Sequence, residues 1–345
     1  MRVYKQFILL IVLICSFPYL ANAQNGGFAG ATTRIGFGPR GLGMGNALTA
    51  VTNQGTYGYY NPALSAIPIS GPQIDLTVAS LDFDRELQTI SAAVALPPKA
   101  GISFYLLRAG VQDIDGRTLS GFHTDFFNTN EFQLATAFGI RFNNNFYGGF
   151  GLKINVADLA DDLSTETNFG LDFGLLAKIT PKINVAFTVQ DLISEYTFNS
   201  QSLFNSNQSQ NVTNAFPTRI KFASAFQEDK WVLTSEFEVR VQRSEIVERE
   251  VILFDGTPNI VENVSEINTS STLLRFGGAY DIHERLTLRS GYRFTDLTDP
   301  SSRSFSAGFS VHLPFDKFSP SIDYAFVSEP FQISDIHIFA LRLNL

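Results

Sequence analysis

The chain has 345 residues, of which 25 are basic and 33 are acidic, so that its formal net charge at pH 7 is −8. This acidic balance argues against nucleic acid as a partner. Only 17% of the residues are charged, and Phe alone occupies 33 positions, a composition that is unusual for a soluble enzyme.

Residues 1–23 have the layout of a secretory signal peptide. A basic start precedes an apolar run over residues 7–17, and Ala21-Asn22-Ala23 is a small-x-small cleavage site. The run is well short of the ~20 residues that a membrane-spanning helix needs. We therefore expect an exported chain that begins at residue 24. Cleavage also removes Cys15, the only cysteine, and leaves 23 basic and 33 acidic residues, a net charge of −10.

From about residue 73 to the C-terminus, apolar and polar residues alternate in segments of roughly nine to twelve residues. Fourteen such segments occur, near 73–81, 87–97, 101–109, 131–142, 146–156, 168–179, 183–191, 218–227, 231–242, 272–282, 285–295, 304–313, 319–328 and 335–345. An even number of strands closes a bacterial barrel without leaving an unpaired edge in lipid. We predict an all-β fold, a transmembrane antiparallel β-barrel of about 14 strands over residues 71–345.

The connections between these segments alternate between short and long. Short periplasmic turns and long surface loops are typical of outer-membrane barrels, which predicts an outer-membrane location with both termini in the periplasm. A soluble β-sandwich also alternates, but it does not need large aromatic residues at the ends of its apolar faces. Such residues cluster near the short turns, as an interfacial girdle would: Phe142, Phe146, Phe226, Trp231, Tyr280 and Phe315.

Residues 24–70 do not alternate and are rich in glycine in their first half. We predict a plug that folds back into the lumen from the periplasmic side, because glycine lets the backbone approach a wall closely. The alternative is a periplasmic tail that leads into the first strand. A short helix is expected over residues 41–51, and Asn61-Pro62 predicts a turn that Asn61 caps.

Two motifs in this segment resemble a known signature. One is RGLGMGNALTAV at residues 40–51, and the other is YNPAL at residues 60–64. They resemble the N-terminal signature of the PorV/PorQ family, part of the wider group of FadL-like fourteen-stranded outer-membrane barrels. The residues that carry the resemblance are Arg40, Gly41, Gly43, Met44, Gly45, Asn61, Pro62 and Ala63.

The resemblance implies one of two functions. PorV-like proteins are accessories of the type IX secretion system that bind exported cargo through their surface loops and hand it onward. FadL-like proteins pass small hydrophobic molecules through the barrel and sideways into the lipid. The implied partners are secreted cargo proteins and secretion-system components, besides outer-membrane lipid and lipopolysaccharide.

The two longest connections, residues 192–217 and 243–271, are the candidate partner-binding loops, because loops on a rigid scaffold often carry binding. Their apolar residues are Tyr196, Phe198, Leu203 and Phe204 in the first and Val251, Ile252, Leu253 and Phe254 in the second. The second run could add a strand to an extended partner. The alternative is that both loops merely fold over the barrel mouth.

The polar faces of the predicted strands carry many charges. Arg219 and Lys221 should lie beside Glu236 and Glu238 on the neighbouring strand, as a charge ladder in the lumen. Because apolar ligand sites are mostly apolar, an interior this charged does not suit free passage of a fatty acid. On the sequence alone we therefore favour the secretion accessory, with the hydrophobic transporter as the alternative.

The sequence offers no catalytic or metal-binding pattern. The four histidines lie far apart, without the spacing of a metal site, and no nucleophile and base are placed together by a recognisable motif. We expect no enzymatic activity, no cofactor and no metal.

Overall fold

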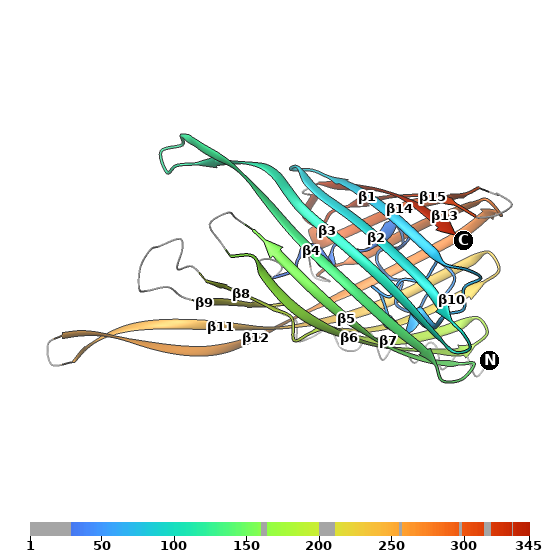
Figure 1. Ribbon diagram of the computed structural model, residues 1–345, viewed down its shortest axis with the longest axis horizontal. Coiled ribbons are helices and arrows are strands. Elements are labelled where there is room, and N and C mark those ends of the chain that lie inside the picture. The colour runs from blue at the N-terminus through green and yellow to red at the C-terminus, as the bar shows by residue number, and fades with distance from the viewer. Residues whose placement is uncertain are drawn as a thin grey trace.

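The computed structural model describes residues 29–159, 164–199, 211–254, 257–296, 299–313, 319–332 and 334–345. Within these ranges fourteen strands form a closed antiparallel barrel, as predicted (Figure 1). The barrel strands are β1 (Gln73–Leu81), β2 (Arg85–Leu96), β3 (Ala100–Arg117), β4 (His123–Arg141), β5 (Phe146–Asp158), β6 (Glu166–Thr180), β7 (Ile183–Leu192), β10 (Thr218–Glu228), β11 (Trp231–Phe254), β12 (Thr257–His283), β13 (Leu286–Phe294), β14 (Arg303–His312), β15 (Ser321–Ser328) and β16 (Asp335–Asn344).

The barrel closes where β1 pairs with β16, through an unbroken register from Gln73 opposite Asn344 to Leu81 opposite Ile336. Side chains alternate between the lumen and the outside along this seam. Phe339 on β16 is exposed on the outer face, whereas its neighbour Ile338 is fully buried. The period of two that places apolar side chains toward lipid is therefore the physical reason for the fold.

Aromatic rings pair near the short turns, which we call the short-turn end of the barrel. The Phe142 and Phe146 rings lie 5.7 Å apart, and the Trp231 and Tyr280 rings 4.2 Å apart. Phe315, also expected in this girdle, lies outside the described residues. No helix in the described part of the chain is long and apolar enough to cross a membrane.

The opposite end, which we call the long-hairpin end, is more regular than the sequence suggested (Figure 1). Residues 243–271 were expected to form a loop, but β11 and β12 remain paired as far as Phe254 opposite Thr257. Likewise β3 and β4 extend to Arg117 and His123. The loop prediction was wrong here because backbone N–H and C=O groups can pair between strands whether or not the side chains alternate in polarity.

The connection at residues 192–217 also contains strands. Strands β8 (Glu195–Asn199) and β9 (Asn211–Ala215) form a separate two-stranded sheet. It lies next to β6 and β11, but among the described residues it joins neither of them in a strand ladder. This hairpin is therefore attached to the barrel mainly through side chains and through its own ends.

Residues 29–70, which we call the inner segment, lie inside the barrel (Figure 1). The segment contains η1 (Thr32–Arg34), α2 (Gly38–Gly43) and η2 (Pro62–Ala66). α2 contacts β1 and β13 to β16, whereas η2 contacts β2 to β6, so that the segment touches opposite walls. The helix expected over residues 41–51 ends at Gly43 instead, because Gly45 and Asn46 adopt positive φ angles that end a helix.

The inner segment runs along the lumen between the two ends of the barrel. Gly30 packs on the ring of Phe216, which precedes β10 at the long-hairpin end. Just after the inner segment ends, the carbonyl of Pro72 accepts a hydrogen bond from the amide of the C-terminal Leu345 at the short-turn end. The predicted signal peptide and the residues up to Phe28 lie outside the described residues, so the signal peptide and the periplasmic position of the N-terminus stay predictions.

Candidate functional site

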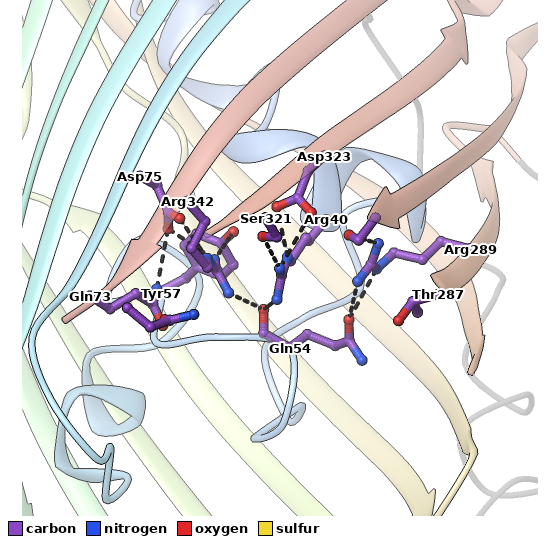
Figure 2. A network of polar contacts seen from close by, with 12 residues as sticks. Arg40, Gln54, Tyr57, Gln73, Asp75, Thr287, Arg289, Ser321, Asp323 and Arg342 are labelled. Carbon is purple, nitrogen blue, oxygen red and sulfur yellow. Dashed lines mark hydrogen bonds and ion pairs between the residues drawn. The ribbon is translucent and has the colours of Figure 1, made fainter. Parts of the chain in front are cut away.

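Arg40, the first residue of the RGLGMG motif, fastens α2 to β15 (Figure 2). Its Nε lies 2.9 Å from Oδ2 of Asp323, and its Nη2 donates to Oγ of Ser321 at 2.8 Å. Its Nη1 reaches the main-chain oxygen of Gln54 at 3.2 Å. A buried arginine thus connects two parts of the inner segment to the barrel wall.

Two further arginines, from the wall, converge on Gln54 (Figure 2). Arg342 donates to the Gln54 carbonyl at 2.9 Å, forms an ion pair with Asp75 at 2.5 Å and bonds the Tyr57 hydroxyl. Arg289 donates twice to Oε1 of Gln54, at 3.0 and 2.7 Å. We call Gln54 with these three arginines the Gln54 site. The sequence analysis missed Gln54, because a single polar residue in a glycine-rich stretch carries no signal of its own.

The glycines of the motif permit close contact with the wall. Gly45 has a φ of +64°, and its amide donates to Oγ of Ser306 at 3.1 Å. A Cβ atom there would lie 2.9 Å from the carbonyl oxygen of Phe276. A Cβ atom on Gly41 would lie 1.9 Å from the Tyr60 hydroxyl. Any larger residue at either position would therefore displace the inner segment.

The second motif fixes η2 to the opposite wall. Oδ1 of Asn61 accepts a hydrogen bond from the amide of Ala63 at 2.9 Å, which is the cap that the sequence predicted. Its Nδ2 donates to the carbonyls of Thr49 and Leu175, at 3.0 and 3.2 Å. On the wall, a Cβ atom at Gly174 would lie 2.0 Å from Oδ1 of Asn61. Asn61, Pro62 and Ala63 are all buried at this contact.

The predicted charge ladder forms in part. Nζ of Lys221 lies 3.8 Å from Glu236 and 3.9 Å from Glu238. Arg275, on β12, holds both glutamates more closely, at 2.7 and 2.8 Å. The prediction was wrong for Arg219, whose ion pair goes elsewhere, because the β10–β11 register places it opposite Arg240.

Arg219 instead joins a buried cluster around Asp191. Its Nε lies 2.7 Å from Asp191, and Lys153 lies 2.7 Å from both Asp191 and Asp172. A bulge between β6 and β7, with a φ of +61° at Asp191, turns this residue and its neighbour Gln190 into the interior. Strict alternation would send one of the two outward, so the sequence pattern could not place Asp191 here.

The structure describes only some of the candidate partner-binding residues. Tyr196 is buried, and its ring centroid lies 5.0 Å from that of Phe216, so its ring faces the protein rather than a partner. Phe198 lies in β8, whereas Leu203 and Phe204 lie outside the described residues. Residues 251–254 belong to β11 and pair with residues 257–260 of β12.

The β3–β4 hairpin presents the most exposed apolar side chains at the long-hairpin end. Leu119 and Phe122 protrude at its tip, next to a charged group on the two strands. There Asp115 contacts His123 at 2.7 Å, and hydrogen bonds from His123 and Arg117 lower the pKa of the Asp115 carboxyl. Within the described ranges, no three His, Cys, Asp or Glu side chains are arranged to hold a metal ion.

The sequence matches no protein-family model and no curated protein. Among solved structures, the chain is similar to the Pseudomonas putida toluene transporter TodX, with a TM-score of 0.59 and 13% identity over 89% of this chain and 97% of that chain. For the CymD monoaromatic hydrocarbon channel the TM-score is 0.56 and the identity is 14%, over 90% of this chain and 96% of that chain. For a Pseudomonas aeruginosa FadL homologue the TM-score is 0.57 and the identity is 12%, over 89% of this chain and 97% of that chain. At these identities the likeness concerns the fold, which is that of the FadL-like barrels.

Proposed function

We propose that this chain is an outer-membrane transporter for small hydrophobic molecules, the alternative that the sequence analysis placed second. The proposal rests first on the fold, which is shared with proteins described as a toluene transporter and a monoaromatic hydrocarbon channel. The PorV/PorQ resemblance concerns only two short motifs, and both lie in the inner segment. These motifs explain how the segment is held and are compatible with either function.

The observation that carries the proposal is how the inner segment is attached. It touches opposite walls of the lumen through apolar packing and through hydrogen bonds and ion pairs that involve side chains, such as those of Arg40 and Asn61, and it joins no strand ladder among the described residues. The wall strands are paired with one another around the closed barrel without it. The segment can therefore shift while the barrel stays intact, which is what a gated channel requires.

An apolar groove on the outer wall supports the hydrophobic class of substrate. Its cavity volume is about 550 Å³, within the usual size of small-molecule sites. Exposed Leu175 and Phe222 form its sides, and Ala186 and Ala223 form part of its floor. Such a groove offers an apolar molecule a mostly apolar place next to the lipid, and Glu236 is its one charged lining residue.

The test uses a disulfide that locks the inner segment. Oγ of Ser65 in η2 and Oγ of Ser103 on β3 lie 2.8 Å apart. The Ser65→Cys/Ser103→Cys variant, reconstituted in liposomes, should take up a monoaromatic hydrocarbon slowly when oxidised and at the wild-type rate when reduced. Ser65→Cys alone is the matched control. Transport would be refuted if liposomes that contain the wild-type protein took up the hydrocarbon no faster than empty liposomes. Gating by this segment would be refuted if the oxidised and reduced forms of the double-cysteine variant gave equal uptake rates.

Secretion remains the second candidate, and the β11–β12 hairpin favours it. Pairing of β10 with β11 begins at Val241, and pairing of β12 with β13 begins at Leu274. Beyond these residues the described parts of β11 and β12 form ladders only with each other, so their outer edges are open to strand addition. Replacing residues 246–265 by a two-residue turn should then abolish co-purification of secreted cargo, while hydrocarbon uptake persists.

A further inference from the structure

The apolar groove on the outer wall, which we call the outer-wall groove, contains two hydroxyl groups. Of its described lining residues only three are polar, namely Ser224, Ser235 and Glu236. Glu236 is buried, and its carboxylate lies 2.7 Å from Nη1 of Arg275 on the lumen side. Ser224 on β10 and Ser235 on β11 are partly exposed instead. These two serines therefore supply the polar side chains that the described lining presents to the outside.

The strand register places the two serines in a row of small side chains. Ser224 lies directly opposite Ser235 on β11 and opposite Val185 on β7. Val185 in turn lies opposite Ala177 on β6. We call these four residues the serine row.

The serine row lies between two rows of larger side chains. The row two residues toward the long-hairpin end consists of Leu175, Phe187, Phe222 and Phe237. The row two residues toward the short-turn end consists of Ile183, Phe226 and Leu233. At one end of the serine row, Phe146 on β5 stands opposite Ala177. The outer-wall groove is therefore a trough between these rows, and the two hydroxyl groups lie in its floor.

The hydroxyl pair has one hydrogen atom to spare. Oγ of Ser224 and Oγ of Ser235 lie 2.9 Å apart, so that one hydroxyl donates to the other. Neither hydroxyl has another hydrogen-bond partner among the described residues. The pair therefore keeps one O–H donor without an acceptor. Because hydrocarbon offers no acceptor either, an oxygen atom of a ligand at this point would remove an unfavourable exposure.

The larger side chains around the serine row favour a ligand with an aromatic ring. Four of the residues that line the groove are phenylalanines, namely Phe146, Phe187, Phe222 and Phe237. The ring centroids of Phe187 and Phe222 lie 4.9 Å apart, with the ring planes tilted by 48°. Aromatic rings attract one another in tilted and offset contacts, in addition to the burial of apolar area. A ligand ring can extend this cluster while an oxygen atom attached to it reaches the hydroxyl pair.

We infer that the outer-wall groove binds an aromatic molecule that carries one hydrogen-bond-accepting oxygen, such as the oxygen of a ketone. The phenylalanine rings contact the aromatic part, and the spare hydroxyl hydrogen distinguishes this molecule from a plain hydrocarbon of the same shape. The inference rests on the proposed function, which it narrows from small hydrophobic molecules in general to one class of them.

The experiment is photolabelling of the purified protein, residues 24–345, in phospholipid nanodiscs with benzophenone. This aromatic ketone accepts hydrogen bonds through its carbonyl oxygen, and on irradiation it bonds covalently to C–H groups beside it. We expect saturable labelling of residues that line the groove, such as Phe222 and Phe237. Diphenylmethane has the same two rings without the oxygen, so it should compete only at concentrations about fivefold higher than an unirradiated ketone of equal size would need.

The Ser224→Ala/Ser235→Ala variant removes both hydroxyl groups and tests the recognition of the oxygen. It should raise the benzophenone concentration for half-saturation about fivefold, and it should leave the affinity for diphenylmethane unchanged. Ser290→Ala is the matched control, because Ser290 is an exposed serine on the outer face of β13 that does not line the groove. Ala177→Phe keeps both hydroxyl groups, fills the trough beside Phe146 and should abolish saturable labelling. Folding of each variant is checked by its altered gel mobility before heating.

Labelling that does not saturate, or that spreads evenly over the outer wall, would show partition into the lipid only and would overturn the site. Equal half-saturation in the wild type and the double-alanine variant would overturn recognition of the oxygen. Saturable labelling in detergent that disappears in nanodiscs would assign the groove to a lipid acyl chain and would also overturn the inference. Because no transport is measured, a failure here leaves the transporter proposal to its own test, and a failure of hydrocarbon uptake leaves the labelling result standing.

Discussion

Gln54 is a neutral residue held by three arginines: Arg289 donates to its side chain, whereas Arg40 and Arg342 donate to its main-chain carbonyl. Among the described residues, two carboxylates, Asp75 and Asp323, form ion pairs with these arginines. Hydrogen bonds from charged donors are roughly twice as strong as those between neutral groups. The arrangement stabilises the fold only when every partner is present, because removing one partner of a buried pair leaves the other charge uncompensated. The contribution of Arg40 can be measured directly.

Replacing Arg40 by Gln should strongly destabilise the folded barrel. Asp323 is almost fully buried and would lose its nearest cation, which costs about 3–5 kcal/mol for a buried pair. The measurement is the free energy of unfolding in urea, in a detergent in which the barrel refolds. Arg117→Gln is the control, because its ion pair with Asp115 is exposed and should cost less than about 1 kcal/mol. Equal losses in the two variants would show that burial of the Arg40 pair is irrelevant.

At the scale of the elements, the sequence predicted the strands where one face meets lipid. There the alternation is imposed by the solvent on each side, and β16 shows it without interruption. The predicted strand ends were wrong where the strands continue past the part that has one face toward lipid. The paired extensions of β3–β4 and β11–β12 lie beyond the barrel, and β8 and β9 form a sheet of their own outside the barrel ladder. Alternation therefore marks the membrane-spanning part of a strand rather than the whole strand.

The orientation of these elements can be tested because residues 24–345 contain no cysteine. Leu119→Cys lies at the fully exposed tip of the β3–β4 hairpin, and Asn144→Cys lies in the short turn between β4 and β5. A membrane-impermeant maleimide should label Leu119→Cys on intact cells. It should label Asn144→Cys only after the outer membrane is permeabilised. The reverse pattern would place the long hairpins in the periplasm.

For the molecule as a whole, we expect the inner segment to restrict passage through the lumen. Deleting residues 24–57 removes η1, α2, Arg40 and Gln54, but keeps Asn61 and every barrel strand. Single-channel conductance in planar bilayers should rise well above that of the wild type, because the lumen loses most of its contents. Folding of the variant is checked by its altered gel mobility before heating. A folded variant with unchanged conductance would mean that the inner segment does not block the lumen.

The contents of the lumen were only partly predictable from the sequence. Motif residues such as Arg40 and Asn61 could be identified, because glycine and proline around them limit the backbone. Their partners could not, since each lies on a strand far away in the chain, as Asp323 and Leu175 do. Which charges meet across the lumen depends on strand register and on bulges. The bulge at Asp191 shifts the register between β6 and β7 and turns Asp191 into the interior. The partners of a side chain inside a barrel are therefore fixed only once the strands have closed around it.

The seam between the first and last strands gives this closed molecule an order of assembly. Asp75 and Arg342 face each other across β1 and β16, so their ion pair exists only after the two ends of the sheet have met. Arg342 also holds Gln54 and Tyr57 of the inner segment. The last step of closure therefore completes the docking of the first described part of the chain. A nascent barrel that stalls before this step would keep an open sheet edge and would lack the Arg342 contacts to the inner segment at the same time.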